Sequence, residues 1–102
     1  MAVDKTIMML GLAMKAGKVV SGETGCENSI RDGSALLVIL AEDASSNTSK
    51  KFRDKCSFYN VPLIVKYKKD EIGRALGKEL RSVAAVTDKG FADALIKKLR
   101  QE

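Results

Sequence analysis

Two carboxylates, Glu42 and Asp43, follow a run of five large aliphatic residues at positions 36–40 after a single alanine. A short apolar run without polar alternation is typical of a strand that is buried on both faces of an α/β sheet. Such sheets usually bind ligands at the carboxyl ends of their strands, so these carboxylates are candidates for a binding site. Alternatively, they only stabilise the positively polarised N-terminus of the next helix.

A glycine-containing segment, S-G-E-T-G at positions 21–25, is a second candidate for binding. It opens a predicted helix, and the free backbone N–H groups at a helix N-terminus suit an oxyanion or a phosphate. The segment lacks the residue spacing of a P-loop. The alternative interpretation is a capped turn whose glycines only satisfy the backbone geometry.

The third candidate is the segment 77–82, which combines two cations, Lys78 and Arg81, with the apolar Leu80. An apolar side chain beside positive charge suits an unstacked nucleotide, because single-stranded bases are read by stacking and apolar contact. The alternative is that Leu80 folds back onto the core. We expect the two loops, 21–25 and 77–82, to lie at equivalent ends of the sheet.

The residue composition argues against catalysis. The chain has no histidine, the commonest general acid–base residue, and its two cysteines, Cys26 and Cys56, are far apart in the sequence. Two thiols without histidine make a poor metal site, and we expect both to be small buried residues. We therefore expect no cofactor, no metal and no enzymatic activity. An enzyme with a cysteine nucleophile is the least favoured alternative.

The formal net charge of +5 is unevenly distributed. The segment 66–81 holds six basic and three acidic residues, a surplus that indicates an edge facing a polyanion. Solvated helix faces could give the same count. The chain of 102 residues is short enough to form one domain, and no apolar run approaches the roughly 20 residues that span a bilayer. We expect a cytoplasmic, monomeric protein without a membrane partner.

Helical and strand patterns alternate along the whole chain. Helices are predicted at 4–16, 23–32, 45–59, 69–76 and from 87 or 88 onward, and strands at 18–21, 36–40, 63–65 and 83–86. The first strand is expected at a sheet edge. This alternation predicts an α/β protein, a three-layer α/β/α sandwich with a roughly four-stranded mixed sheet in which parallel pairs predominate.

Five motifs occur in a characteristic order: G-E-T-G, L-L-V-I-L-A-E-D-A-S, Y-N-V-P, E-I-G-R-A-L-G and S-V-A-A-V. In these motifs and their spacing the chain resembles the kink-turn-binding ribosomal protein family, the archaeal L-seven-Ae type. It is most similar to the small bacterial members, in which A-E-D-A-S, K-C, Y-N-V-P and T-D-K-G-F recur. The resemblance implies an α/β/α sandwich that clamps a sharply bent RNA internal loop. The whole chain, 1–102, is then a single RNA-binding domain of ribosomal-protein type.

The resemblance also implies which residues contact RNA. The segment that would read tandem sheared G·A pairs contains Gly22, Glu23, Thr24, Gly25 and Asn28. The acidic corner that would support this contact is Glu42 and Asp43, and Lys69 and Arg74 would be cations near the RNA backbone. The loop that would cradle an extruded nucleotide contains Leu80, Arg81 and Ser82.

The first loop departs from the archaeal pattern G-T-N-E-x-x-K. Thr24 stands at the asparagine, Gly25 at the glutamate and Asn28 at the lysine, so the charge-assisted base contacts are missing. The resemblance implies a non-catalytic RNA-binding protein that recognises a kink-turn or a similar bent motif, associated with the ribosome. The departure favours an alternative, a protein-interaction module on the same fold with weakened RNA binding.

Overall fold

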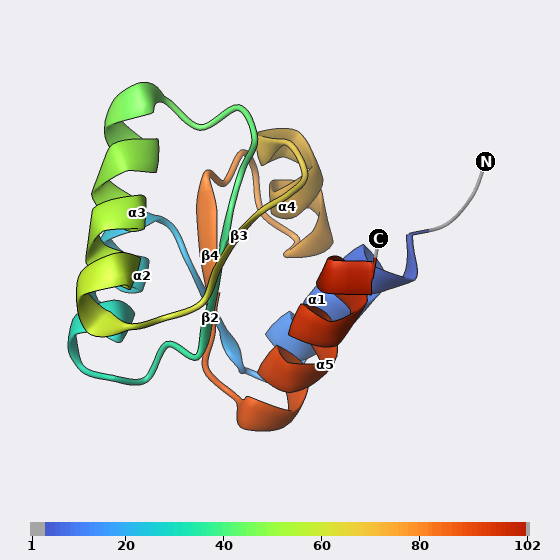
Figure 1. Ribbon diagram of the computed structural model, residues 1–102. Helices are drawn as coiled ribbons and strands as arrows, with labels where there is room; N and C mark the ends of the chain where they lie inside the picture. The colour runs from blue at the N-terminus through green and yellow to red at the C-terminus, as the bar shows by residue number, and fades with distance from the viewer. Residues whose placement is uncertain (1–3, 102) are drawn as a thin grey trace.

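The computed structural model describes residues 4–101, which form five helices and four strands (Figure 1). In chain order these are α1 (Lys5–Lys15), β1 (Val19–Ser21), α2 (Glu23–Arg31), β2 (Leu37–Leu40), α3 (Ser46–Tyr59), β3 (Leu63–Val65), α4 (Lys69–Ala75), β4 (Val83–Val86) and α5 (Lys89–Gln101). The predicted order of elements is confirmed, with bounds that agree to within two residues. Within the described residues, no helix is long and apolar enough to cross a membrane.

The sheet has the strand order β1-β4-β2-β3. Strands β2 and β3 are parallel, whereas β4 lies between β1 and β2 and is antiparallel to both. The predicted mixed four-stranded sheet is therefore confirmed, and so is the edge position of β1. The expectation that parallel pairs predominate was wrong. All four residues of β4 are buried, and such an apolar strand suits a central position in either direction.

Helices α2 and α3 cover one face of the sheet, and α1, α4 and α5 cover the other (Figure 1). Leu37 and Ile39 of β2 belong to the core under α1, α4 and α5. Val38 and Leu40 belong to the core under α2 and α3. The unbroken apolar run of β2 thus arises because both of its faces are buried.

The direction of β4 decides which turns meet. Because β4 is antiparallel to its neighbours, its first two residues lie beside the last residues of β1 and β2. Ala84 pairs with Ser21, and Val83 pairs with Leu40. The segments that follow β1, β2 and β3 therefore lie at the same end of the strands as the segment that precedes β4. We call this end of the sheet, where β1, β2 and β3 finish, the sheet edge.

Candidate functional site

A depression at this sheet edge is lined by residues of two loops that are far apart in the sequence. Its volume is about 240 Å³, and its lining consists of Ser21, Gly22, Glu23, Leu80, Arg81 and Ser82. The family resemblance predicted five of these six residues as RNA contacts, and the sixth, Ser21, belongs to the candidate segment 21–25. The structure thus brings together the loop after β1 and the loop before β4, as expected for loops at equivalent ends of the sheet.

Hydrogen bonds join the two loops across the depression. The backbone N–H of Gly22 donates to the carbonyl oxygen of Val83 at 3.1 Å, which extends the β1–β4 ladder by one residue. The Arg81 guanidinium donates through Nε to Ser21 Oγ at 3.3 Å and through Nη1 to the carbonyl oxygen of Leu80 at 2.9 Å. These contacts hold the positive charge of Arg81 beside the start of α2.

The side chain of Leu80 is 60% exposed and lines the depression. The alternative that it folds back onto the core is therefore wrong. A large apolar side chain held in this open position is available for contact with a ligand.

The acidic corner after β2 is bonded to the same edge. The backbone N–H of Ala41 donates to the carbonyl oxygen of Ser82 at 2.8 Å. The Asp43 carboxylate accepts a 2.8 Å hydrogen bond from the backbone N–H of Lys69, the first residue of α4. Asp43 therefore caps α4 and not the helix that follows it in the sequence, because α3 is capped by Ser45. Glu42 is exposed, and its carboxylate forms an ion pair with Lys68 Nζ at 3.9 Å.

The loop before β4 is fastened to α4. The backbone N–H of Lys78 donates to the carbonyl oxygen of Gly73 at 2.8 Å, and that of Arg81 donates to the carbonyl oxygen of Lys69 at 3.1 Å. The backbone of Lys69 thus contacts both Asp43 and Arg81. One residue joins the acidic corner to the loop that carries Leu80.

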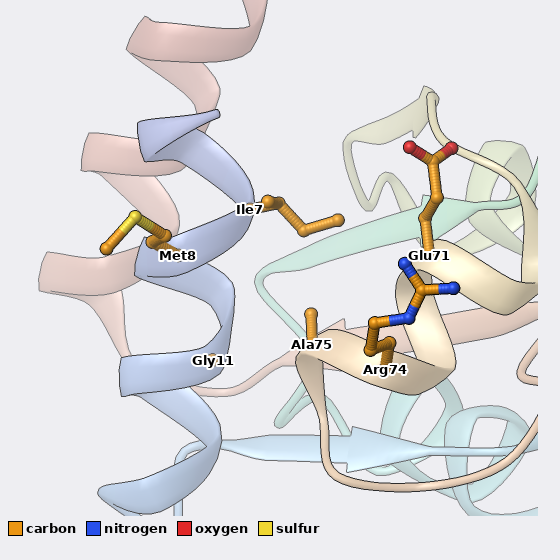
Figure 2. A pocket seen from close by; sticks show the side chains of 6 residues that line it. All are labelled: Ile7, Met8, Gly11, Glu71, Arg74 and Ala75. Atoms are coloured by element: carbon orange, nitrogen blue, oxygen red, sulfur yellow. The ribbon is translucent and has the colours of Figure 1, made fainter. Parts of the chain in front are cut away.

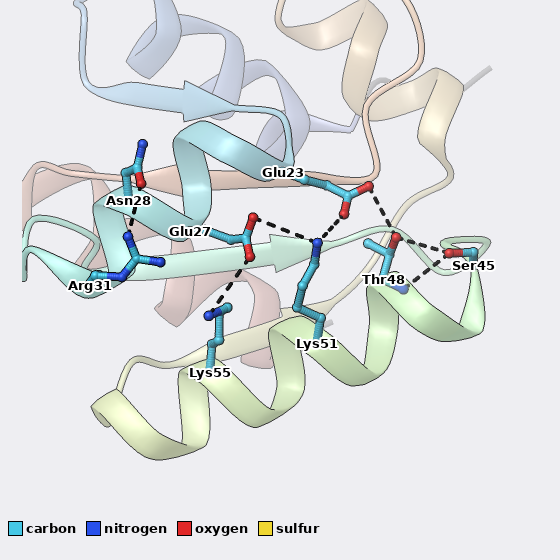
Figure 3. Close-up of polar contacts among 8 residues, drawn as sticks. All are labelled: Glu23, Glu27, Asn28, Arg31, Ser45, Thr48, Lys51 and Lys55. Atoms are coloured by element: carbon cyan, nitrogen blue, oxygen red, sulfur yellow. Dashed lines mark hydrogen bonds and ion pairs between the residues drawn. The ribbon is translucent and has the colours of Figure 1, made fainter.

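The side chain of Glu23 contacts two residues of α3 (Figure 3). Its carboxylate pairs with Lys51 Nζ at 2.8 Å and accepts a 3.2 Å hydrogen bond from Thr48 Oγ1. The Lys51 ammonium lowers the pKa of Glu23, chiefly through this direct contact, and the Glu23 carboxylate raises the pKa of Lys51. Lys51 also lies 3.8 Å from Glu27. Thr48 and Lys51 were not predicted as site residues. The sequence did contain a signal for the ion pairs, because Glu23 and Glu27 on α2, like Lys51 and Lys55 on α3, are four positions apart and so lie on one side of their helix.

The remaining predicted residues of the first loop lie on α2. A Cβ at Gly25 would stand 2.7 Å from Cγ1 of Val20, so glycine allows α2 to pack closely on β1. The glutamate of the archaeal pattern would not fit here without a shift. Thr24 is exposed, and so is Asn28, whose side-chain oxygen accepts a 3.4 Å hydrogen bond from Arg31 (Figure 3).

Arg74 lies away from the depression. It lines a separate pocket between α4 and α1, together with Ile7 and Ala75 (Figure 2). Its guanidinium is 3.6 Å from the Asp70 carboxylate one turn earlier on α4. The structure therefore does not bring Arg74 together with Arg81 and Leu80, and its contact with an RNA backbone stays a prediction.

The two cysteines are poor nucleophiles. Both belong to the core under α2 and α3, and burial raises the pKa of Cys26 to about 12 and that of Cys56 to about 11. A thiol with such a pKa carries almost no thiolate at neutral pH. Among residues 4–101, no three histidine, cysteine or carboxylate side chains are grouped to hold a metal ion. At the sheet edge, Arg81 contributes a positively charged side chain and Leu80 an exposed apolar one.

Comparison with known proteins shows the family to which this chain is similar. Residues 4–96 match the family model described as ribosomal protein L7Ae/L30e/S12e/Gadd45 family. The chain is 56% identical to the RNA-binding protein YlxQ of Bacillus subtilis over 92 residues, which are 86% of this chain and 88% of that protein. It is 32% identical to the large ribosomal subunit protein eL30 of Methanosarcina mazei, over 91% of this chain and 85% of that protein.

A solved structure of a Bacillus halodurans protein of unknown function has the same fold. The two superpose with a TM-score of 0.91 at 38% identity, over 94% of this chain and 97% of the other. The family resemblance and the fold class predicted from the motifs are both confirmed. The chain belongs to the ribosomal protein L7Ae/L30e/S12e/Gadd45 family.

Proposed function

We propose that this protein is a non-catalytic RNA-binding protein that binds structured RNA at the sheet edge. The observation that carries the proposal is the single depression that Gly22 and Glu23 share with Leu80, Arg81 and Ser82. Relatives named as an RNA-binding protein and as a large ribosomal subunit protein support it. The whole chain, 1–102, would act as one RNA-binding unit.

The proposed contacts divide between phosphate and base. Arg81 and Lys69 supply positive charge for phosphates, which sets affinity and position on the RNA. Gly22 has no side chain to cap α2, so the N–H groups of the first turn of this nine-residue helix add to the phosphate site. Leu80 supplies the apolar contact for an extruded base. Thr24 and Asn28 would reach base edges with neutral hydrogen-bonding groups.

The proposed target is a kink-turn or a similarly bent RNA, in the cytoplasm and in association with the ribosome. Thr24, Gly25 and Asn28 replace the asparagine, glutamate and lysine of the archaeal pattern. Each lost base contact is expected to cost about 1–3 kcal/mol of discrimination, by analogy with other nucleic-acid readers. We therefore expect a smaller preference for tandem G·A pairs than the archaeal pattern would give.

A low-salt gel-shift comparison tests the proposal. The chain is titrated into a kink-turn RNA and into a matched RNA whose G·A pairs are replaced by Watson–Crick pairs. Tighter binding to the kink-turn RNA supports recognition of the bend. Equal binding to both RNAs indicates that the protein binds structured RNA in general. Absence of binding to either RNA contradicts the proposal.

A second candidate is a protein-interaction module on the same fold with weakened RNA binding. Two observations favour it: the Glu23 carboxylate is already paired with Lys51, and position 25 is occupied by a packing glycine. This candidate predicts a stable protein complex together with failure to bind kink-turn RNA at low salt.

A further inference from the structure

Two apolar hollows that share Met9 lie between α1 and α5, and together we call them the groove. One part has a volume of about 530 Å³ and is lined by Met8, Met9 and Leu12 of α1, with Lys5 and Lys98 at its end. The adjoining part, of about 300 Å³, shares Met9 and is lined also by Asp88, Gly90, Phe91 and Ala94.

The outer side of α1 is unusually apolar for a surface helix. Leu10 and Ala13 of α1 already pack into the core, yet Met8 is 55% exposed and Leu12 is 59% exposed. These two residues are four positions apart and therefore lie on the same side of the helix. Methionine side chains adapt to different partners and are common at surfaces that bind helices. The face thus has the features of an interface rather than of a solvated surface.

The charges around the groove have one predominant sign. Lys5 and Lys98 line one end, and Lys15 continues the exposed stripe of α1. Within residues 4–101 none of these three lysines forms an ion pair. Asp88 lines the adjoining part, where its carboxylate accepts a 2.9 Å hydrogen bond from the backbone N–H of Phe91 at the start of α5. As far as residues 4–101 show, the groove therefore presents apolar surface beside lysines that form no ion pair.

We propose that this groove binds an amphipathic helix of a partner protein, with apolar side chains against Met8 and Leu12. Acidic side chains of that helix would pair with Lys5 and Lys98, so the partner is recognised by charge complementarity as well as by apolar contact. A second copy of the chain fits less well, because it would bring two faces with the same unpaired lysines together in a protein of net charge +5. The proposal does not depend on RNA binding, since none of these residues lines the sheet-edge depression.

Two designed peptides provide the probe. Both are about four turns long and carry the same leucine stripe with i, i+3, i+4, i+7 spacing. One has glutamates beside the stripe and the other has lysines. Binding to the full chain is measured by fluorescence anisotropy, and the contact surface is mapped from amide chemical shifts. We expect the acidic peptide to bind with a Kd in the micromolar range and to shift residues of α1 and α5.

Three variants make the test specific. Met8→Glu should weaken the acidic peptide about tenfold or more, because it places a charge in the centre of the contact. The double variant Lys5→Glu, Lys98→Glu should exchange the preference and bind the lysine peptide more tightly. Leu80→Asp should leave peptide binding unchanged, because Leu80 is about as exposed as Met8 but lies at the sheet edge. Circular dichroism melting checks that each variant is folded.

Several outcomes overturn the proposal. Equal binding of both peptides shows that charge does not select the partner, and no binding of either at about 1 mM shows that the groove does not take a helix. A dimer in sedimentation equilibrium that is abolished by Leu12→Glu assigns the face to a second copy of this chain. Shifts confined to the sheet edge place the peptide at the wrong surface.

Discussion

The α-carbon of Gly73 on α4 faces the backbone of Glu79, and a Cβ at position 73 would overlap the carbonyl oxygen of that residue. The loop is held against the helix by the hydrogen bond from the Lys78 N–H to the Gly73 carbonyl oxygen. The absence of a side chain at position 73 thus sets how far the loop stands from α4. It thereby sets the position of Leu80 and Arg81 over the depression.

We therefore expect Gly73→Ala to displace the loop. A methyl group forced against a backbone carbonyl should cost about 1–3 kcal/mol of unfolding free energy and lower RNA affinity at the same time. Urea unfolding and the gel shift measure the two effects. Gly90→Ala on α5 is the control, because its Cβ would stand 3.2 Å from the side-chain carboxylate of Asp88 rather than against backbone. Wild-type stability and affinity of Gly73→Ala would contradict the assigned role of the close approach.

Removal of the Asp43 side chain should destabilise the fold, because Asp43 caps α4 through the Lys69 N–H at 2.8 Å. Loss of such a cap costs about 0.5–2 kcal/mol, so Asp43→Ala should shift the urea midpoint, while Asp43→Asn, which keeps an acceptor oxygen, should retain most of the stability. Glu42→Ala is the matched control, because its exposed 3.9 Å pair with Lys68 contributes little. Equal effects of Asp43→Ala and Glu42→Ala would refute the capping role.

The sequence predicted the layers because each element has a local signal. Asp4 caps α1 and Ser45 caps α3, as their side-chain types suggest, and the unbroken apolar run predicted the doubly buried β2. Strand direction has no such local signal. The antiparallel insertion of β4 depends on pairs of residues that are 43 to 67 positions apart, from Leu40–Val83 to Val19–Val86, and the alternation of helices and strands does not encode it.

The candidate site was predictable in its loops but not in its connections. The glycines and cations of the two loops marked them, whereas the sequence left open whether Leu80 is exposed, as the structure has it, or folded onto the core. The capping of α4 by Asp43 and the pairing of Glu23 with Lys51 depend on tertiary proximity. Gly73 had a weak signal, because a glycine inside a predicted helix often marks a close backbone approach.

Leu80→Asp should lower RNA affinity without unfolding the protein. The side chain is 60% exposed, so its replacement removes little buried surface, while a carboxylate would repel the phosphates of a bound RNA. The gel shift and the melting temperature are measured together. Leu12→Asp is a matched control, since Leu12 is 59% exposed on α1 and lies outside the depression. If both variants bind RNA like the wild type, the loop does not contact the base.

Lys69→Ala should weaken RNA binding and flatten its salt dependence. Loss of one phosphate contact reduces the slope of log affinity against log salt by roughly one unit or slightly less. The fold should persist, because the contacts of Lys69 with Asp43 and Arg81 use its backbone N–H and carbonyl group. A filter-binding titration measures the slope, with Lys97→Ala on α5 as the control. An unchanged slope for Lys69→Ala would remove this residue from the site.

The Glu23–Lys51 pair should make the stability of the folded protein depend measurably on pH in the acidic range. The pKa of Glu23 is lowered in the folded protein from its usual 4.5, chiefly by the Lys51 ammonium. A carboxyl group with a lowered folded-state pKa stabilises the fold at pH values above its unfolded-state pKa, and this contribution is lost as the pH falls through the folded-state pKa. The wild type should therefore be more stable than Lys51→Met at pH 6, and the difference should shrink as the pH falls below 4.5.

Urea unfolding of the wild type and of Lys51→Met between neutral and acidic pH measures this difference directly. Lys50→Met controls for the loss of a lysine on the same helix, because Lys50 pairs with the exposed Asp54 one turn away. Its stability should follow that of the wild type more closely across the range. The same stability difference between wild type and Lys51→Met at every pH would mean that Lys51 acts through packing of its aliphatic chain rather than through the Glu23 carboxylate. In that case the start of α2, and with it the backbone N–H groups of the depression, would be held against α3 by apolar contact.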